Sequence, residues 1–328
     1  MKSLWNQTEA AQCKDDLALR VYSSQLLGSD HSLVLHGGGN TSVKIRQPNL
    51  FGEQEEILYV KGSGWDLSSI QAEGFTPVRM QPLLRLARLE SLSDLEMVNQ
   101  LRINQTIATA PTASVEAILH ALLPYKYVDH THADALIAIT NTPEGEERIR
   151  QIYADDLVII PYVMPGFDLA RVVAQRFPEA AHDGTLGMVL MNHGLFSFGA
   201  TARESYERMI GLVDRAERYL QEQDAWNTPA ADGPSCCQVD MSRLPRLRQE
   251  LSQTAGFPVI LRSYQEAAVM AFCRRDDLFQ VSQQGPATPD HVIRTKRLPL
   301  LGTDVAGYAK AYQAYFCLLY TSPSPRDH

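Results

Sequence analysis

Residues 128–139 read VDHTHADALIAI, and their character changes halfway along the stretch. A polar first half followed by an apolar second half is typical of a strand that leads into a helix. His130 and His132 are two residues apart, so in an extended strand both imidazoles point to the same side. This geometry suits two neighbouring ligands of a tetrahedral zinc ion, although a pair of this kind also occurs by chance.

A third histidine, His193, follows an apolar strand pattern at residues 188–191 and precedes Gly194 and a further strand pattern at residues 195–198. We expect its ring at the edge of the sheet, where a histidine more often has a structural role. Together with the pair it completes a set of three. Three protein ligands leave one coordination position open, as in catalytic zinc sites. The alternative is a metal-free core in which the histidines only form hydrogen bonds.

Glu116 lies in residues 111–120, PTASVEAILH, where the spacing predicts a helix over residues 114–123. An unpaired glutamate that faces inward on an apolar helix costs free energy. Glu116 therefore either points to solvent or faces the metal as a ligand or general acid/base. His120 is four residues further along the same face, and a packed helix histidine is the more common case.

Two glycine-rich turns interrupt the first quarter of the chain, at residues 37–42 (GGGNTS) and residues 62–64 (GSG). Such turns expose backbone N–H groups that can bind phosphate, although each can also be an ordinary hairpin loop. The first follows an apolar stretch that we interpret as a strand, residues 33–35, and it matches neither a dinucleotide fingerprint nor a P-loop. Lys44 or Lys61 could form a Schiff base, but nothing in the sequence lowers the pKa of either.

The remaining periodicity indicates an α/β protein with short, mainly antiparallel strands flanked by helices. Further helices are predicted at residues 17–27, 82–92 and 203–220, and further strands at residues 43–45, 57–60 and 157–162. Residues 227–235 are rich in Pro, Gly, Ala and Asp, which indicates a linker. The linker would join a domain over residues 1–226 to a small α/β segment over residues 236–316.

Composition excludes several classes of function. The 328 residues carry a formal net charge of -8 and no basic run, so a nucleic-acid partner has no electrostatic support. No apolar run approaches the ~20 residues of a membrane span, and the polar N-terminus lacks a signal-peptide core. Five cysteines without a CxxC motif indicate a reducing compartment. We expect a cytoplasmic protein with no membrane partner.

The end of the chain is unusual. Residues 317–327 read CLLYTSPSPRD and resemble one reading frame of a DNA-library transposon adapter. We expect residues 317–328 to be a non-native tail and the natural protein to continue beyond Phe316. The alternative is a Ser/Pro-rich tail that belongs to the protein.

Taken in this order, the motifs resemble those of the class II aldolase/adducin head family over residues 17–220. The resemblance implies the fuculose-phosphate aldolase-like fold, with a central, mainly antiparallel sheet flanked by helices. It also implies one zinc ion per chain bound by His130, His132 and His193, with Glu116 as the catalytic acid/base. The substrate-binding or phosphate-binding residues that it implies are Gly39, Asn40, Thr41, Ser63, Gly64 and Ser114.

Two features depart from the family pattern. Residues 112–115, Thr-Ala-Ser-Val, do not reproduce two serines directly before the glutamate. The tyrosine that the family often supplies from a neighbouring subunit has only Tyr153 and Tyr162 as candidates. The resemblance implies a homo-oligomer.

The family implies retro-aldol cleavage of a ketose or ketose 1-phosphate, in which zinc stabilises an enediolate. A sugar-phosphate epimerase or dehydratase on the same fold is an alternative, and a non-catalytic, adducin-like binding head is another. For each of these enzymatic functions, the expected partner is a small sugar or sugar phosphate.

Residues 129–142 and 287–296 (ATPDHVIRTK) also resemble proteins in which this head is fused to a C-terminal short-chain dehydrogenase. Some of these are bifunctional rhamnulose-1-phosphate aldolase/dehydrogenase proteins. The resemblance implies that residues 236–316 connect to a dehydrogenase domain beyond Phe316. NAD would be a cofactor only if that domain is present.

Overall fold

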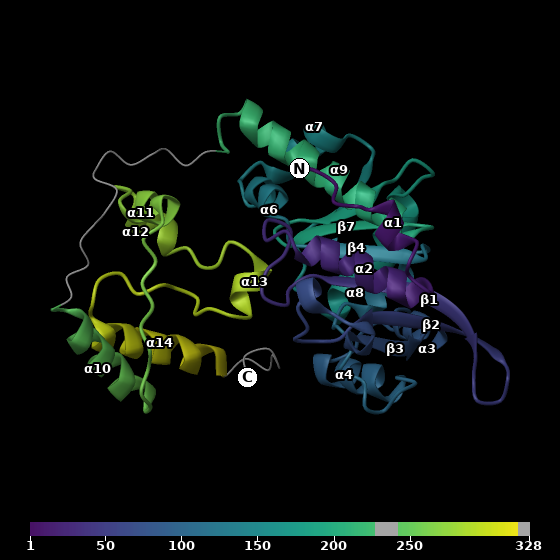
Figure 1. Cartoon of the computed structure of the whole chain (residues 1–328), viewed down its shortest axis with the longest axis horizontal. Helices are drawn as coiled ribbons and strands as arrows, with labels where there is room; N and C mark the ends of the chain where they lie inside the picture. The colour runs from purple at the N-terminus through teal and green to yellow at the C-terminus, as the bar shows by residue number, and fades with distance from the viewer. Residues whose placement is uncertain (227–241, 321–328) are drawn as a thin grey trace. The chain divides into compact units, whose positions relative to one another are not determined.

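The computed structural model describes residues 1–226 and 242–320, which form two compact units (Figure 1). The first unit contains Met1–Gln223 together with Ala287–Thr295, a short segment that returns from much later in the chain. The remaining described residues form the second unit. The predicted linker, residues 227–235, and residues 321–328 of the predicted tail lie outside the described residues.

A seven-stranded sheet forms the centre of the first unit, with the strand order β3-β2-β1-β4-β7-β6-β5. All neighbouring strands pair antiparallel except β5 and β6. The expected mainly antiparallel sheet is therefore confirmed. The strands are β1 (Asn40–Pro48), β2 (Gln54–Lys61), β3 (Phe75–Arg79), β4 (Tyr127–Thr131), β5 (Leu157–Ile160), β6 (Gly187–Leu190) and β7 (Gly194–Gly199).

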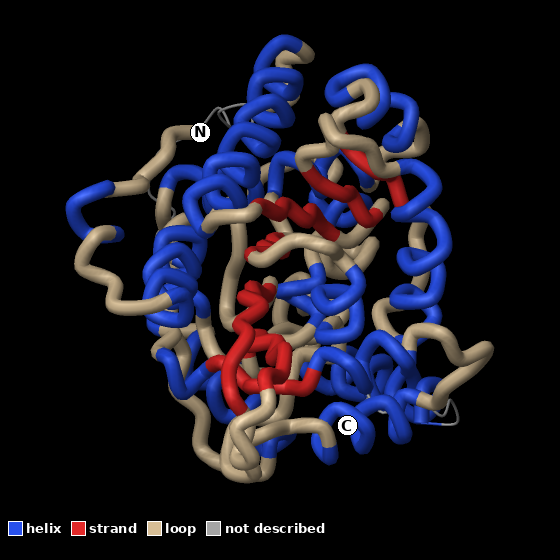
Figure 2. The backbone as a smooth tube through the Cα atoms, turned by 90° about the vertical axis from the view of Figure 1, so that its right-hand side faces the viewer, coloured by secondary structure: helices blue, strands red, loops and turns tan. Residues whose placement is uncertain are grey.

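Helices cover both faces of this sheet. In Figure 2 the red strands lie between blue helices on either side. The helices on one face are α2 (Asp16–Gly28), α6 (Asp134–Thr140), α7 (Gly145–Tyr153) and α9 (Ala202–Glu222). On the other face lie α3 (Met80–Leu86), α4 (Asp94–Ile103), α5 (Ala117–Leu122) and α8 (Phe167–Ala180). Shorter elements are α1 (Gln7–Ala10), η1 (Leu67–Ser69), η2 (Ala72–Gly74) and α13 (Pro289–Val292).

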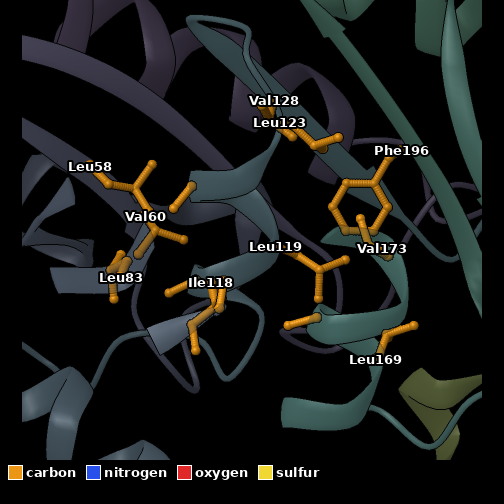
Figure 3. Packing of buried hydrophobic residues seen from close by; sticks show 14 of the residues in the cluster. Leu58, Val60, Leu83, Ile118, Leu119, Leu123, Val128, Leu169, Val173 and Phe196 are labelled. Atoms are coloured by element: carbon orange, nitrogen blue, oxygen red, sulfur yellow. The ribbon is translucent and has the colours of Figure 1, made fainter. Parts of the chain in front are cut away.

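Two main hydrophobic clusters follow from the alternation of side chains along the strands. In β5, Val158 and Ile160 belong to the cluster beneath α5 and α8, whereas Leu157 belongs to the cluster beneath α9. Figure 3 shows the first cluster, in which Ile118 and Leu119 of α5 pack close to strand residues such as Val60. Burying each such side chain contributes roughly 1.5–3 kcal/mol, so this packing holds α5 against the sheet.

A buried ion pair ties α2 to the middle of the sheet. Arg20 of α2 lies 2.6 Å from the Asp129 carboxylate of β4, and neither side chain is exposed to solvent. Ser205 of α9 donates a 2.5 Å hydrogen bond to the other oxygen of Asp129. Burial raises the pKa of Asp129, while Arg20 and Ser205 lower it. Two helices on the same face therefore fix the strand that carries the histidine pair.

The structure corrects two local predictions. Residues 33–35 are not a strand: the N–H groups of Leu33 and Val34 donate back to the Asp30 carbonyl, so Leu33 ends a turn and irregular backbone follows. Strand β3 was not predicted; it contains Pro77, which a strand at the edge of a sheet tolerates. Helices α4, α7 and α8 were also not predicted, whereas residues 128–139 form a strand and then a helix, as expected.

The second unit differs from the predicted α/β segment. Its described residues form the helices α10 (Leu244–Ala255), α11 (Ala267–Cys273), α12 (Leu278–Ser282) and α14 (Val305–Tyr320), and between residues 242 and 320 there is no strand. The apolar run at residues 259–261 finds no strand partner, and Ile260 is 94% exposed. None of the helices in the described part of the chain combines the length and apolar character that a membrane span requires.

Candidate metal centre

The pleat of β4 separates the residues of the DHTH sequence onto two faces. Asp129 and Thr131 contact Ser205 and Met209 of α9, whereas the imidazole of His130 faces the opposite side. His132 follows the end of the strand, and its Nε2 lies 3.1 Å from Nε2 of His130. The predicted placement of both imidazoles on one side is therefore what the structure shows.

His193 reaches the same place from the turn between β6 and β7. One ligand atom from each of His130, His132 and His193 lies within 4.8 Å of the others, and all three residues are buried. The turn needs an unusual backbone: Asn192 has a φ of 57°, and its side chain donates to the Thr140 carbonyl at 3.0 Å. A Cβ on Gly194 would lie 2.5 Å from the Thr131 carbonyl oxygen, so only glycine fits beside the histidine pair.

The second nitrogens of His130 and His132 are held by acceptors. Nδ1 of His130 donates to the Leu195 carbonyl at 3.1 Å, and Nδ1 of His132 donates to the Asp290 carboxylate at 2.6 Å. Each hydrogen is therefore on Nδ1, and each Nε2 presents a lone pair to the shared space. Burial lowers the pKa of His130 to about 3, which keeps its imidazole neutral, the state in which histidine binds metals.

Glu116 stands at the start of α5 with its carboxylate among these imidazoles. Its Oε2 lies 3.5 Å from Nε2 of His130, and its Oε1 lies 3.6 Å from Nε2 of His193. Asn40 donates a 2.6 Å hydrogen bond to Oε2. Burial by itself raises the pKa of the Glu116 carboxyl, but His130, His193 and the Asn40 bond outweigh it and hold this pKa below its usual range. Glu116 is only 4% exposed, so it does not point to solvent.

His120 belongs to the hydrogen-bond network behind Glu116. Its Nδ1 contacts the Ser42 hydroxyl at 2.7 Å, and its Nε2 contacts Oδ1 of Asn40. Burial lowers the pKa of His120 to about 3. Both ring nitrogens are occupied, so His120 acts as a packed helix histidine that orients Asn40 rather than as a metal ligand.

The two glycine-rich turns lie next to each other. A Cβ added to Gly37 would come within 3.4 Å of the Gly64 carbonyl oxygen. The second turn is tied to the segment before Glu116, because the Ser63 N–H donates to the Thr112 carbonyl at 2.7 Å. Asn40 donates to both the Ser114 hydroxyl, at 3.2 Å, and Glu116. The fold thus places Asn40, Ser114 and Glu116 together beside the two turns.

Other predicted phosphate-binding residues have different surroundings. Gly39 has a φ of 57° and passes so close to β4 that a Cβ would lie 2.8 Å from the His130 carbonyl oxygen. The Thr41 hydroxyl contacts Ser24 of α2 at 2.8 Å in the core. Ser63 and Gly64 are exposed. A role for each of them in binding phosphate stays a prediction.

The lysines have the lowered pKa values that the sequence did not indicate. Burial lowers the pKa of Lys44 to about 7 and that of Lys61 to about 8. Both amino groups donate to backbone carbonyl oxygens, Lys44 to Tyr125 at 2.6 Å and Lys61 to Gly37 at 2.6 Å. These contacts explain why both lysines are buried: each amino group holds a backbone carbonyl group in place.

The candidate tyrosines also differ. The Tyr153 side chain is fully buried, and its hydroxyl donates to the Leu212 carbonyl at 2.7 Å. Tyr162 is 54% exposed. Of the two, Tyr162 is the one accessible to a second subunit.

The donor set fits a metal ion. Three imidazole nitrogens and a carboxylate are ligands that zinc and similar divalent ions accept. Glu116 Oε1 is buried and has no hydrogen-bond partner among the described residues, which is costly unless another group pairs with it. A cation among the three imidazoles would provide that pairing.

The fold and this site place the chain in a known class. Residues 20–220 match the family described as the Class II Aldolase and Adducin N-terminal domain, and residues 238–326 match the family described as Aldolase class II, second domain. The chain therefore belongs to the class II aldolase and adducin family, as the motifs predicted.

Individual relatives show where the similarity lies. The chain is 32% identical, over 345 residues, to the uncharacterized oxidoreductase YuxG of Bacillus subtilis (strain 168), covering 96% of this chain and 49% of that protein. The chain thus spans about half the length of this curated relative.

Among solved structures, the N-terminal class II aldolase domain of a conserved protein from Thermoplasma acidophilum is 41% identical. The match covers 67% of this chain and 99% of that chain, with a TM-score of 0.62. L-Fuculose-1-phosphate aldolase from Thermus thermophilus is 17% identical over 62% of this chain and 95% of that chain, with a TM-score of 0.40. The Thermoplasma match identifies the fold as that of a class II aldolase domain.

Proposed function

We propose that the chain is a metal-dependent aldehyde-lyase that cleaves a ketose or ketose 1-phosphate by a retro-aldol reaction. One observation carries this proposal: His130, His132 and His193 converge around the buried carboxylate of Glu116. Such an arrangement brings an open metal site and an acid/base group together.

We infer that the ion is zinc, at one per chain, held by the three histidines. When bound, the ion would act as a Lewis acid on a carbonyl oxygen of the substrate. The lowered pKa of His130 supports its role as a ligand, because near neutral pH no proton occupies the lone pair that the imidazole would offer to the ion.

Glu116 is the residue that would transfer a proton. Asn40 holds Oε2 through a 2.6 Å hydrogen bond, while Oε1 has no hydrogen-bond partner among the described residues. Retro-aldol cleavage breaks a carbon–carbon bond and leaves a carbon that must be protonated. The hydroxyl next to the breaking bond loses its own proton as it becomes a carbonyl, so the reaction releases one proton and consumes one. We propose that the Glu116 carboxylate takes up a proton and delivers it through Oε1 to the carbon that is left.

The phosphate of a ketose 1-phosphate would be bound at the two adjacent glycine-rich turns. Ser114 contributes a hydroxyl within hydrogen-bond distance of Asn40, and Ser63 and Gly64 are accessible from solvent. We propose that these groups, with the turn at Gly39 and Asn40, donate to the phosphate oxygens. Thr41 would contribute only after its hydroxyl leaves Ser24.

The test is metal content followed by product analysis. Elemental mass spectrometry of the purified chain should find about one zinc per chain, lost in a His130→Ala/His132→Ala variant. His182→Ala is a matched control, because His182 is a histidine of the same unit that lies outside the cluster of three. Absence of metal in the wild type, even after reloading with zinc, would remove this function and favour the non-catalytic binding head.

A sugar-phosphate epimerase or dehydratase would use the same metal and the same glutamate. An assay of ketose 1-phosphates separates the three activities by product. Cleavage yields two carbonyl fragments, epimerisation an isomer, and dehydration a product lighter by one water.

We also propose that the natural protein includes a dehydrogenase region with its own NAD site. The chain spans about half of a curated relative that is named an oxidoreductase. Sequencing the source locus past Phe316 tests this idea, and a native stop codon directly after His328 would contradict it.

A further inference from the structure

We propose that Asp290 is a positioning residue for the metal ligand His132, and that the segment Ala287–Thr295 is therefore part of the metal centre. This inference rests on the proposed function, because it assumes that His132 binds an ion. The residue is 158 positions away from His132 in sequence. It lies in residues 238–326, which match the second aldolase domain, and not in residues 20–220, which match the N-terminal domain and contain the three histidines.

The contact between the two side chains is short and buried. Oδ1 of Asp290 lies 2.6 Å from Nδ1 of His132, and the two side chains are 2% and 8% exposed. Since the carboxylate accepts, the hydrogen stays on Nδ1, and the lone pair of Nε2 is left free on the side of His130, whose Nε2 lies 3.1 Å away. A carboxylate in this position fixes the ring of a metal-binding histidine and makes it a stronger ligand.

Asp290 is itself held from two sides. Its second oxygen, Oδ2, accepts a 2.8 Å hydrogen bond from the N–H of Leu35, two residues before the first glycine-rich turn. The segment is also anchored at both ends: Asn141 donates to the Ala287 carbonyl at 3.0 Å, and Arg294 donates to the His36 carbonyl at 2.9 Å. A carboxylate fixed in this way has little freedom to leave His132.

The first glycine-rich turn is shaped around this carboxylate. A Cβ on Gly38 would lie 1.5 Å from Oδ1 of Asp290, so any larger residue would displace the carboxylate. One residue thus contacts both the candidate metal ligand His132 and the turn proposed to bind phosphate. A change at Asp290 is therefore expected to disturb both the metal centre and this turn.

His130 provides an internal comparison. Its Nδ1 donates to a backbone carbonyl, that of Leu195, which no side-chain substitution removes. His132 instead depends on the Asp290 carboxylate. Within the segment Ala287–Thr295, the sensitivity of the metal centre to substitution should therefore be concentrated at Asp290.

The experiment measures the affinity of the full chain for Zn²⁺ alone, by competition with a chromophoric chelator. The variants are Asp290→Asn, which keeps the size of the side chain, and Asp290→Ala, which removes the acceptor. The matched control is Asp183→Asn, an exposed aspartate of the same unit. Visible absorption of the Co²⁺-loaded proteins reports the ligand geometry independently, and thermal melting of each variant reports its folding.

We expect Asp290→Ala to weaken Zn²⁺ binding about 10- to 100-fold, with Asp290→Asn intermediate and Asp183→Asn unchanged. A changed Co²⁺ spectrum should accompany the loss. Folded Asp290→Asn protein that binds Zn²⁺ as tightly as the wild type, with an unaltered spectrum, would overturn the inference. If Asp290→Ala does not fold, Asp290→Asn decides.

The two proposals fail in different ways. A wild type that binds no Zn²⁺ overturns the metal-dependent function and this inference together. Wild-type binding that is abolished by His130→Ala but unaffected at Asp290 overturns the positioning role alone.

Discussion

At the scale of the residue, the histidines of this site differ in what their second nitrogen contacts. His130 donates to a carbonyl and His132 to a carboxylate, which leaves Nε2 of each available. His120 is equally buried, but Ser42 and Asn40 occupy both of its nitrogens. The hydrogen-bond partner, rather than burial, therefore separates a candidate ligand from a packing residue.

Replacement of Glu116 by glutamine tests its role as the acid/base. The Glu116→Gln side chain keeps the size of glutamate and can still accept from Asn40, so we expect it to retain the metal. The loss of proton transfer should lower kcat about 10²- to 10⁴-fold. Metal content and a cleavage assay measure the two effects separately, and a wild-type rate in a metal-loaded variant would exclude Glu116 from the chemistry.

Lys44 should make stability depend on pH. Burial lowers its pKa in the folded protein to about 7, whereas the ordinary lysine value is 10.5. Between these values the unfolded chain holds the proton that the folded chain has lost, so the free energy of unfolding rises with pH. The free energy of unfolding rises by at most about 1.4 kcal/mol per pH unit in this range, and the pH dependence disappears once pH falls below about 7.

Urea unfolding of the wild type and of Lys44→Met, at pH 7 to pH 9, isolates this contribution. The difference in stability between the two proteins should shift in favour of the wild type as pH rises. A difference that stays constant over this range would show that the Lys44 pKa is not lowered in the folded state.

At the scale of the element, the site depends on close approach between β4 and the start of β7. The register pairs His130 with Phe196 and Thr131 with Leu195, and the Phe196 ring stacks on the His130 imidazole at 4.1 Å between centroids. Phe196 is also a member of the cluster in Figure 3. The hydrophobic core therefore supports the His130 ring directly.

Gly194→Ala should disturb this approach. The added Cβ would lie 2.5 Å from the Thr131 carbonyl oxygen and 2.8 Å from Cε1 of His130, so β7 must shift. We expect a loss of about 1–3 kcal/mol in stability, as for other overpacked sites, together with weaker Zn²⁺ binding. Chemical denaturation and chelator competition measure the two losses.

Gly211→Ala is the matched control for this substitution. Gly211 lies in α9, and a Cβ there has no heavy atom within 4 Å. We expect it to be neutral or to stabilise the helix by up to about 1 kcal/mol. Equal behaviour of the two alanine variants would show that the close approach at Gly194 does not constrain the site.

At the scale of the whole molecule, every candidate ligand belongs to one unit. The histidines, Glu116 and Asp290 all lie in the unit formed by Met1–Gln223 and Ala287–Thr295. The end of β4, the turn between β6 and β7, the start of α5 and the segment Ala287–Thr295 must all be folded before these groups meet. Metal binding should therefore be coupled to the folding of this unit.

Loading with Zn²⁺ should raise the melting temperature of this unit. The stabilisation is about 2.7 kcal/mol when free ion exceeds the dissociation constant about 100-fold. Calorimetry with zinc and with a chelator measures the shift, and His130→Ala/His132→Ala provides the control that should not respond. An unchanged melting temperature in the wild type would contradict a metal site assembled by the fold.

Local patterns in the sequence were sufficient for the main outline of the first unit. The strand-to-helix change at residues 128–139, the histidine pair on one face and the amphipathic helix over residues 203–220 are all present in the structure. These features depend on periodicity within one element, which the chain carries locally. The order of the motifs was also sufficient to indicate the family, which the domain match over residues 20–220 confirms.

The tertiary structure alone decided which groups share the site. Asp290 lies in the motif at residues 287–296, yet nothing in the sequence places it against His132, because the contact spans 158 residues. The same holds for Asn40 beside Glu116, and for Thr41, whose hydroxyl faces Ser24 instead of the site. Strand register and the return of a distant segment set these contacts. Both depend on the packing of the whole unit, whereas the helices and strands themselves follow from the spacing of neighbouring residues.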